Sequence, residues 1–381
     1  MNDYFIDTFE LPYKASFDEI RQLTKHMDFF KVKDKKYYIC NDRSTMGFML
    51  KSTPCSRGER YNENKKHKLV IRVDPDRVFR KGIKDKHIYD IETFDHMIEY
   101  MDTLLEYWFK DISLNDFQLT RIDITKDIHD IPEPIIREYI MLMRQMPLYS
   151  GFKLKKYYRM PDGYLPENSF EVWNNESRLE FVVYNKHHEV MSKTKYSDED
   201  KEYYKNTMRL EVRCNRRYFK NQTKDLTTKE ALMKIFRIRE HIAEDTFRSV
   251  FHYFDDVCFL APYWQKKYIS KYNSNKTAKA AKMLWLSEKM NDKSRPAFES
   301  ILELYPKSYD AKINLIRYFE DMGLSPIPIL NRDIPYLQSV SSILGFSTVS
   351  TRDEKYYRMI SARSTKKLFI YESNRKHSGN A

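Results

Sequence analysis

Residues 119–127 (LTRIDITKD), 178–186 (RLEFVVYNK) and 208–214 (MRLEVRC) decide how this chain folds. In each segment charged and apolar residues alternate, and the side chains of a β-strand point alternately to its two faces. Each segment therefore predicts a strand with one polar and one apolar face. Placed side by side, the three strands predict a sheet with an apolar back and a front on which carboxylates lie among lysine and arginine side chains.

The polar face of this predicted sheet carries the residues from which we expect chemistry. Carboxylate oxygens are the ligands that Mg²⁺ and Mn²⁺ prefer, and such a metal stabilises the charge that develops on a scissile phosphate. The predicted metal ligands are Asp123, Asp127 and Glu211. The side chains predicted to hold the phosphate or the leaving oxygen are Lys186, Arg121, Arg209 and Arg213. Taken singly, each carboxylate has a structural alternative, an exposed ion pair with a neighbouring cation.

The composition favours a polyanionic partner. The net charge is +12, and the chain contains 29 Tyr and 23 Phe among 381 residues. Single-stranded nucleic acid binds to aromatic rings that lie among cations, and residues 155–159 (KKYYR) have this character. We therefore predict Lys155, Lys156 and Arg159 as DNA contacts. The alternative is that the abundance of Lys and Tyr reflects an AT-rich genome.

Other features exclude several classes of protein. The four cysteines are far apart in sequence and form no paired motif, which is typical of a reducing compartment. No apolar run approaches the length of about 20 residues that a membrane span needs. There is no Gly-rich phosphate loop, so we do not expect an ATPase or a helicase. These features predict a cytoplasmic protein without a membrane partner.

Working outward from the three segments, the pattern predicts an α+β fold with two domains. Strands are expected at 68–73 and 170–173, and helices at 91–109 and 132–146. From residue 228 onward the pattern is helical, with helices expected at 231–254, 278–290, 296–304 and 310–322. We therefore predict an antiparallel-rich, curved sheet domain at 1–230 and a helical domain at 231–381. The helix at 310–322 and its predecessor form either a helix-turn-helix-like DNA reader or an ordinary packed pair.

Three motifs in this order resemble those of rolling-circle replication initiators. They are T-R-x-D-x-x-x-D at 120–127, Y-x-K-x-x-E at 184–189 and R-x-E-x-R at 209–213. The pattern is similar to that of the Rep_trans initiators and relaxases of Gram-positive plasmids and conjugative elements, and to that of the filamentous-phage initiators. The resemblance covers about residues 68–220. It implies that Asp123, Asp127 and Glu211 bind a metal, with Lys186 and Glu189 nearby.

The resemblance also implies a tyrosine nucleophile, which attacks a DNA phosphate and forms a protein–DNA ester. In the Rep_trans relatives this tyrosine lies in a Y-x-G-S strand just before the Y-x-K motif. The corresponding residues 170–177 (FEVWNNES) contain neither tyrosine nor glycine. The candidates that remain are Tyr164, in the turn-rich loop upstream, and Tyr203 and Tyr204, just before the third strand.

The sequence therefore predicts a replication initiator of a mobile element that nicks one DNA strand with a tyrosine and Mg²⁺ or Mn²⁺. Its expected partners are single-stranded or origin duplex DNA and a host helicase. The first alternative is a DNA-binding protein of the same descent that has lost its nucleophile. The second is an RNA-binding or structural protein with basic aromatic surfaces.

Overall fold

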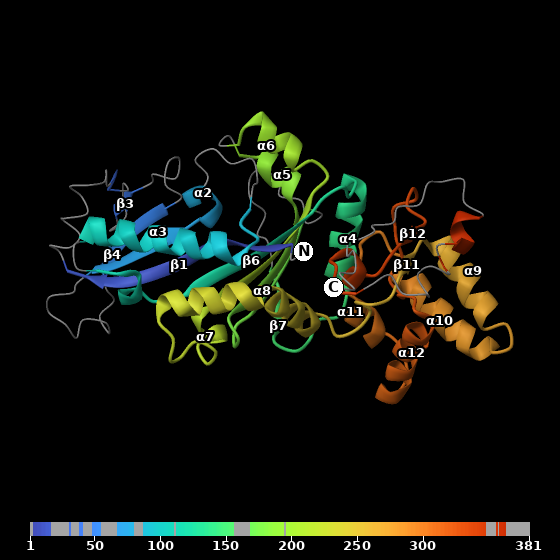
Figure 1. Ribbon diagram of the computed structural model, residues 1–381. Coiled ribbons are helices and arrows are strands. Elements are labelled where there is room, and N and C mark those ends of the chain that lie inside the picture. Colours follow the sequence, from blue (N-terminus) through green and yellow to red (C-terminus); the bar gives the residue numbers. More distant parts are fainter. Residues whose placement is uncertain are drawn as a thin grey trace, which may run out of the picture.

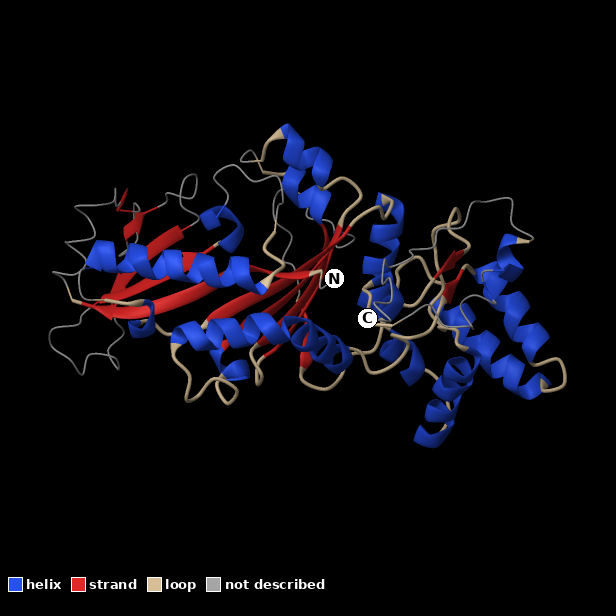
Figure 2. Ribbon diagram, viewed as in Figure 1, coloured by secondary structure: helices blue, strands red, loops and turns tan. Residues whose placement is uncertain are grey.

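The computed structural model describes residues 3–16, 30–31, 38–40, 48–54, 67–79, 87–109, 112–155, 168–193, 196–347, 356 and 358–362. Among these residues the largest element is one ten-stranded antiparallel sheet (Figures 1 and 2). Its order is β2-β3-β4-β5-β1-β6-β10-β9-β8-β7. The strands are β1 Tyr4–Ala15, β2 Phe30–Lys31, β3 Tyr38–Cys40, β4 Phe48–Pro54, β5 His67–Val73, β6 Arg121–Ile128, β7 Phe152–Leu154, β8 Ser169–Asn174, β9 Leu179–Asn185 and β10 Met208–Asn215.

Helices surround the sheet and form most of the C-terminal part (Figure 2). Those that accompany the sheet are α2 Pro75–Phe79, α3 Ile91–Phe109, α4 Glu133–Gln145, α5 Lys186–Met191, α6 Asp198–Tyr203, α7 Arg216–Phe219 and α8 Thr228–Val250. The C-terminal part contains α9 Pro262–Tyr272, α10 Thr277–Met290, α11 Phe298–Glu303, α12 Tyr309–Met322 and α13 Val340–Ile343. A two-stranded sheet, β11 Phe259–Leu260 with β12 Tyr336–Leu337, lies among them.

The apolar face of the large sheet packs against α3, α4 and α8. Ile122 of β6 and Val212 of β10 point into this core and are fully buried. Beside them α3 runs along α8, and the rings of Phe94 and Phe236 stack with their centres 4.2 Å apart. Burying one side chain of this size contributes roughly 1.5–3 kcal/mol. The apolar face therefore holds the sheet together and leaves the opposite face free to carry polar groups.

A β-bulge in β1 brings an additional carboxylate to the polar side of the sheet. Ile6 pairs with Ile124 and Thr8 pairs with Asp123, so the register shifts by one residue between Ile6 and Thr8. Asp7 is the extra residue, and it accepts a hydrogen bond from Arg209 of β10 at 3.2 Å. Bulges commonly redirect one side chain in this way.

Helix α4 joins the sheet to the C-terminal part. Its residues Ile136 and Ile140 are fully buried, and Tyr139 donates a hydrogen bond to the carbonyl of Gln338 at 3.1 Å. Gln145 donates to the carbonyl of Pro296 at 3.2 Å. Because α4 is buried on several sides, it belongs to the core of both parts.

The structure confirms the predicted α+β class and the large antiparallel sheet. The helices expected at 91–109, 132–146, 278–290, 296–304 and 310–322 correspond to α3, α4, α10, α11 and α12. Helix α8 begins at Thr228, earlier than expected, because Thr227 and Glu230 form a capping box. The predicted domain boundary at 230/231 falls inside α8, which packs against the sheet.

None of the helices in the described ranges combines the length and the apolar character that a membrane crossing requires.

Candidate active site

The strand register gathers the polar side chains of the three signature segments on one face. Asp123 of β6 lies opposite Arg213 of β10, Thr125 lies opposite Glu211, and Asp127 lies opposite Arg209. Acidic and basic residues thus face one another across adjacent strands, where side chains interact directly. On the other side of β10, Arg213 pairs with Glu180 of β9, Glu211 with Val182 and Arg209 with Tyr184.

Asp123 is buried and is satisfied by three donors. The guanidinium of Arg121 donates to both of its oxygens, at 2.9 and 2.8 Å. The hydroxyl of Thr8 donates to Oδ2 at 2.8 Å. A carboxylate bound in this way is fixed in position, since each oxygen has a charged donor.

Asp127 and Arg209 form a buried ion pair. Arg209 donates to the two oxygens of Asp127 at 2.5 and 2.6 Å, and both side chains are almost completely buried. The Arg209 guanidinium carbon also lies 5.5 Å from the Phe5 ring centre and 5.4 Å from that of Tyr204. Burial alone would raise the pKa of Asp127, but the charge and hydrogen bonds of Arg209 and His87 lower it.

His87 extends this pair into a chain of buried charges. Its Nε2 lies 3.1 Å from Asp127 and its Nδ1 lies 2.5 Å from Asp76, while its ring stacks on Phe5 with centres 3.7 Å apart. Burial would lower the pKa of His87, but the two carboxylates raise it above its ordinary value. A ring with a carboxylate at each nitrogen donates from both, which requires the protonated form.

Asp7 forms the partly exposed end of the same chain. Its side chain is 32% exposed, whereas that of its partner Arg209 is 3% exposed. Burial raises the pKa of Asp7, and so do the negative charges of Glu211 and Asp123, against the lowering effect of Arg209. Among the carboxylates of this series of charged groups, Asp7 is thus the most exposed to solvent.

A second cluster centres on Glu211. The hydroxyl of Tyr184 donates to Glu211 Oε1 at 2.5 Å, and Arg213 donates to Oε2 at 2.7 and 3.1 Å. Burial raises the pKa of Tyr184, and the negative charge of Glu211 raises it further. Burial would raise the pKa of Glu211, but Arg213 and Arg209 lower it. Glu211 is therefore ionised and holds the Tyr184 hydroxyl as an acceptor.

Lys186 lies beside this cluster because β9 passes directly into α5. Asn185 caps the helix by accepting a hydrogen bond from the backbone N–H of His188 at 3.1 Å. The buried Lys186 ammonium donates to Glu189 at 2.7 Å and lies 5.8 Å from the Tyr184 ring centre. Burial opposes ionisation of Glu189, yet Lys186 lowers its pKa to about 2. The structure thus brings Lys186 and Glu189 together.

The predicted nucleophiles differ in their surroundings. Tyr203 is 37% exposed, and its ring meets that of His129 edge-on with centres 5.0 Å apart. Tyr204 is 7% exposed, and burial raises its pKa. Tyr164 lies outside the described residues. A further tyrosine, Tyr184, lies on the polar face with its hydroxyl against the carboxylate of Glu211.

The predicted DNA contacts are engaged within the protein or lie beyond the described residues. Arg121, Arg209 and Arg213 each donate to carboxylates of the polar face. Lys155 forms an ion pair with Glu171 of β8. Lys156 and Arg159 lie outside the described residues. Contact of these six side chains with DNA stays a prediction.

Asp123, Asp127 and Glu211 do not fit a single shared metal ion in this arrangement. Asp123 and Asp127 are separated by about 13 Å along β6, because a strand rises by about 3.3 Å per residue. Mg²⁺ binds its ligand oxygens at about 2.1 Å. In the described ranges no group of three His, Cys, Asp or Glu side chains is placed to hold a metal. On the polar face each of the three carboxylates is bound by an arginine, and metal binding stays a prediction.

Sequence reasoning missed Asp7, Asp76 and His87, and it did not consider Tyr184 as a nucleophile. Asp76 and His87 carry no recognisable spacing relative to the three motifs. The sequence alone could have identified Tyr184 as a candidate nucleophile, because Tyr184 begins the Y-x-K motif and shares a face with Lys186.

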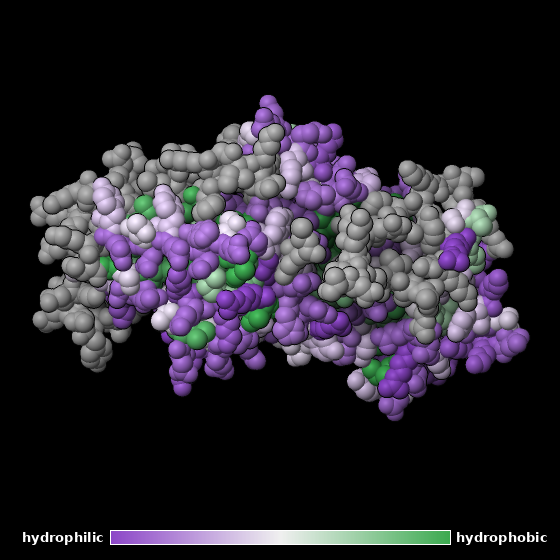
Figure 3. Space-filling view, viewed as in Figure 1, coloured by the Kyte–Doolittle hydropathy of each residue, from purple (hydrophilic) through white to green (hydrophobic). Residues whose placement is uncertain are grey.

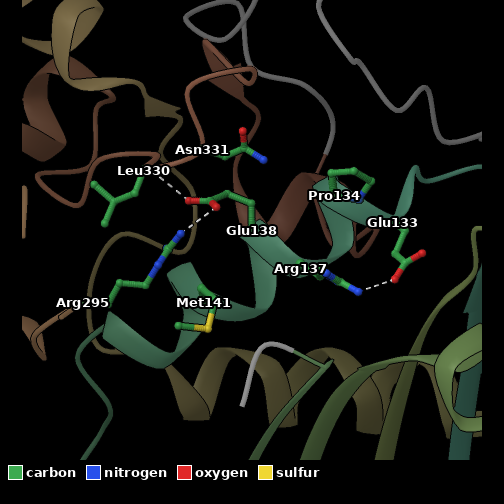
Figure 4. Close-up of a pocket in the computed structure, with 8 residues that line it drawn as sticks. All are labelled: Glu133, Pro134, Arg137, Glu138, Met141, Arg295, Leu330 and Asn331. Carbon is green, nitrogen blue, oxygen red and sulfur yellow. Dashed lines mark hydrogen bonds and ion pairs between the residues drawn. The ribbon is translucent and has the colours of Figure 1, made fainter. Parts of the chain in front are cut away.

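A cavity of about 470 Å³ lies where α4 meets the C-terminal part (Figure 4). Arg137 donates to Glu133 at 2.7 Å, and Arg295 donates to Glu138 at 2.7 Å. The backbone N–H of Leu330 also donates to Glu138, at 3.0 Å. The pair of Arg137 and Glu133 lies within α4, whereas the two contacts of Glu138 tie α4 to the C-terminal part, so we interpret the cavity as a feature of this junction.

Part of the chain is similar to known replication proteins. Residues 81–235 match a family model that describes the N-terminal region of a phage replication-associated protein. Among solved structures, the chain is similar to the "Rolling Circle Replication Initiator Protein from Geobacillus stearothermophilus". That similarity has 9% identity and a TM-score of 0.32, and it covers 65% of this chain and 85% of that chain. No curated protein matches the sequence significantly.

Residues 81–235 are thus similar to the N-terminal region of a phage replication-associated protein. The resemblance to the filamentous-phage initiators that the motifs predict is thereby confirmed over residues 81–235, the part that contains β6, β9 and β10.

Proposed function

We propose that this protein nicks one strand of DNA to start replication of a mobile element, and that the polar face of the sheet is its active site. The observation that carries the proposal is the hydrogen bond from the Tyr184 hydroxyl to Glu211 at 2.5 Å, beside Lys186. A tyrosine, a carboxylate base and a cation are the groups that a phosphoryl transfer to tyrosine needs. All three lie in the part of the chain that matches the replication family.

In the proposed step Tyr184 is the nucleophile. Its oxygen forms a bond to phosphorus while a bond from phosphorus to a deoxyribose oxygen breaks. The phenolic proton passes to Glu211, and the leaving oxygen takes a proton from Lys186 or from water. The product is a DNA–tyrosine phosphodiester and a free deoxyribose hydroxyl. Lys186 also offsets negative charge on the transferring phosphate.

The experiment uses supercoiled plasmid DNA that carries the element's own origin, incubated with the full chain and Mg²⁺ or Mn²⁺. We expect open-circular DNA with protein covalently attached, and we expect EDTA to abolish it if the predicted metal dependence holds. Tyr184→Phe should remove both nicking and the covalent adduct. The matched controls are Tyr164→Phe, Tyr203→Phe and Tyr204→Phe, since each removes the hydroxyl of a tyrosine that the sequence offers as a candidate nucleophile.

Two results would overturn the proposal. If Tyr184→Phe kept the covalent adduct and one of the other variants lost the adduct, that other tyrosine would be the nucleophile. Absence of nicking by the folded, unsubstituted chain on origin DNA would remove the catalytic role altogether.

One observation favours a second function, sequence-specific DNA binding without cleavage. Each of the three predicted metal ligands is already bound by a guanidinium, so its negative charge is balanced without a metal. A protein of this kind binds origin DNA with a steep dependence on salt and leaves it intact. Binding without nicking in the experiment above would select this alternative.

A further inference from the structure

Helices α9 and α10 form a helix pair at the end of the molecule farthest from the sheet (Figure 1). They are joined by the short turn at 273–276. Asn273 ends α9 and is buried, and its side chain donates to the carbonyl of Ile269 at 3.0 Å. The backbone N–H of Lys276 then donates to the carbonyl of Asn273 at 2.8 Å and leads into α10. Two helices joined by so short a turn have the connectivity of a helix-turn-helix.

The two helices pack through only part of their length. Trp264 and Ile269 of α9 are buried, as are Met283 and Leu286 of α10. The buried positions of α10 thus begin at Met283 and occupy its second half. In the first half, residues 277–282, every residue is exposed or half-buried, and Ala280 is the one that packs against the core. In helix-turn-helix proteins the N-terminal residues of the second helix are those that contact base edges.

The charge of this helix pair is almost entirely positive. Residues 262–287 contain no Asp or Glu, and the one acidic residue of the pair is Glu288, in the last turn of α10. They contain the lysines Lys266, Lys267, Lys271, Lys276, Lys279 and Lys282. This end of the molecule is hydrophilic at its surface (Figure 3). By contrast α12, part of the helix pair that the sequence suggested as a DNA reader, carries Asp310, Glu320 and Asp321 as well as basic residues.

Contacts of the lysines leave their charge available. Lys267 Nζ lies 5.6 Å from the ring centre of Tyr263, which is 66% exposed. Lys279 Nζ lies 4.2 Å from the ring centre of Tyr318. An aromatic ring orients an ammonium group without neutralising it, whereas a carboxylate would cancel its charge.

We propose that α9 and α10 bind duplex DNA, with the first half of α10 in the major groove and the surrounding lysines on the phosphates. The partner follows from the charge and the exposure together, because an exposed helix face fits the major groove and the lysines around it fit the phosphate backbone. Ala278 and Ala281 lie among the lysines of α10, and their small side chains permit close approach to the bases. The proposal rests on the proposed function for the identity of the partner, the origin duplex.

The test compares Lys279→Ala/Lys282→Ala with the control Lys220→Ala/Lys224→Ala, which removes two exposed lysines after α7. Alanine is the best helix former, so the first pair of changes leaves α10 intact. Fluorescence anisotropy measures binding of the full chain to a labelled duplex of origin sequence and to one of its single strands, between about 50 and 200 mM salt. We expect the α10 variant to bind the duplex more weakly, with a salt slope reduced by about 2.

The expected pattern is selective. The control should bind the duplex as the unsubstituted chain does, and the α10 variant should keep its binding to the single strand. An unchanged duplex affinity and salt slope in the α10 variant would overturn the proposal, and so would an equal loss for duplex and single strand. Nicking of a single-stranded origin oligonucleotide by the α10 variant tests the proposed function separately, because that reaction does not need the duplex contact.

Discussion

Replacing Arg209 by methionine should destabilise the protein strongly, although methionine fills much of the same volume. Arg209 is 3% exposed and donates three hydrogen bonds, two to Asp127 and one to Asp7. Without it Asp127, whose side chain is 1% exposed, keeps only the bond to His87 among the described residues. Removing one partner of a buried ion pair costs about 3–5 kcal/mol, mainly because the other charge stays buried without compensation. We expect the free energy of unfolding to fall by about this amount.

The double variant Arg209→Met/Asp127→Asn separates this cause from a simple loss of packing. The asparagine that replaces Asp127 would still accept a hydrogen bond from His87, and neither buried charge of the pair would remain. We expect each single variant to cost about 3–5 kcal/mol and the double variant to cost no more than the larger of the two. Urea unfolding followed by circular dichroism measures all four proteins. Additive losses in the double variant would refute the reasoning, because they would mean that the two side chains do not stabilise each other in solution.

Two further predictions concern pH and helix capping. The pKa of His87 is raised in the folded protein, so its contribution to stability is complete below the unfolded value of about 6.5 and is lost as the pH rises through the folded value. The unsubstituted chain should therefore melt at a higher temperature than His87→Gln, and this difference should be larger at about pH 6 than at about pH 9. An equal difference at the two pH values would show that His87 is not charged in the folded protein. Thr227→Ala removes the capping box of α8 and should lower the free energy of unfolding by about 1 kcal/mol, measured by urea unfolding against Thr223→Ala. An equal loss in both variants would contradict a specific role of the cap.

The sequence predicts those parts of the fold in which a short segment carries its own pattern. Strands β6, β9 and β10 show an alternation that is interrupted at Lys126 and Val182, and α3 shows one apolar stripe, so each is recognisable without its neighbours. Strand β1 is different. Its core-facing residues Tyr4, Ile6, Phe9 and Leu11 change phase at the bulge, which makes the alternation look broken. The bulge depends on pairing with β6, more than a hundred residues away, and no local pattern encodes that.

The candidate site is predictable to a similar extent. The motifs identify Asp123, Asp127 and Glu211 as members of one polar face, and the register places all three on adjacent strands, with Asp123 and Asp127 about 13 Å apart. Lys186 follows directly after β9. They do not reveal which cation binds which carboxylate. That choice depends on three-dimensional neighbours such as Thr8 and His87, which come from other elements. Isolated polar residues of this kind have no sequence signal until the fold places them.

The burial of α4 in two cores has a consequence for the spacing between the two proposed DNA sites. Because α4 packs on the sheet and also binds Gln338 and Pro296, a packed helix rather than an extended linker connects the sheet with the C-terminal part. If both proposals hold, this connection sets the distance between the duplex bound by α9 and α10 and the phosphodiester bond that is nicked. Since duplex DNA turns once in about 10.5 base pairs, inserting about five pairs into that interval would present the opposite side of the helix, and a full turn would restore its orientation.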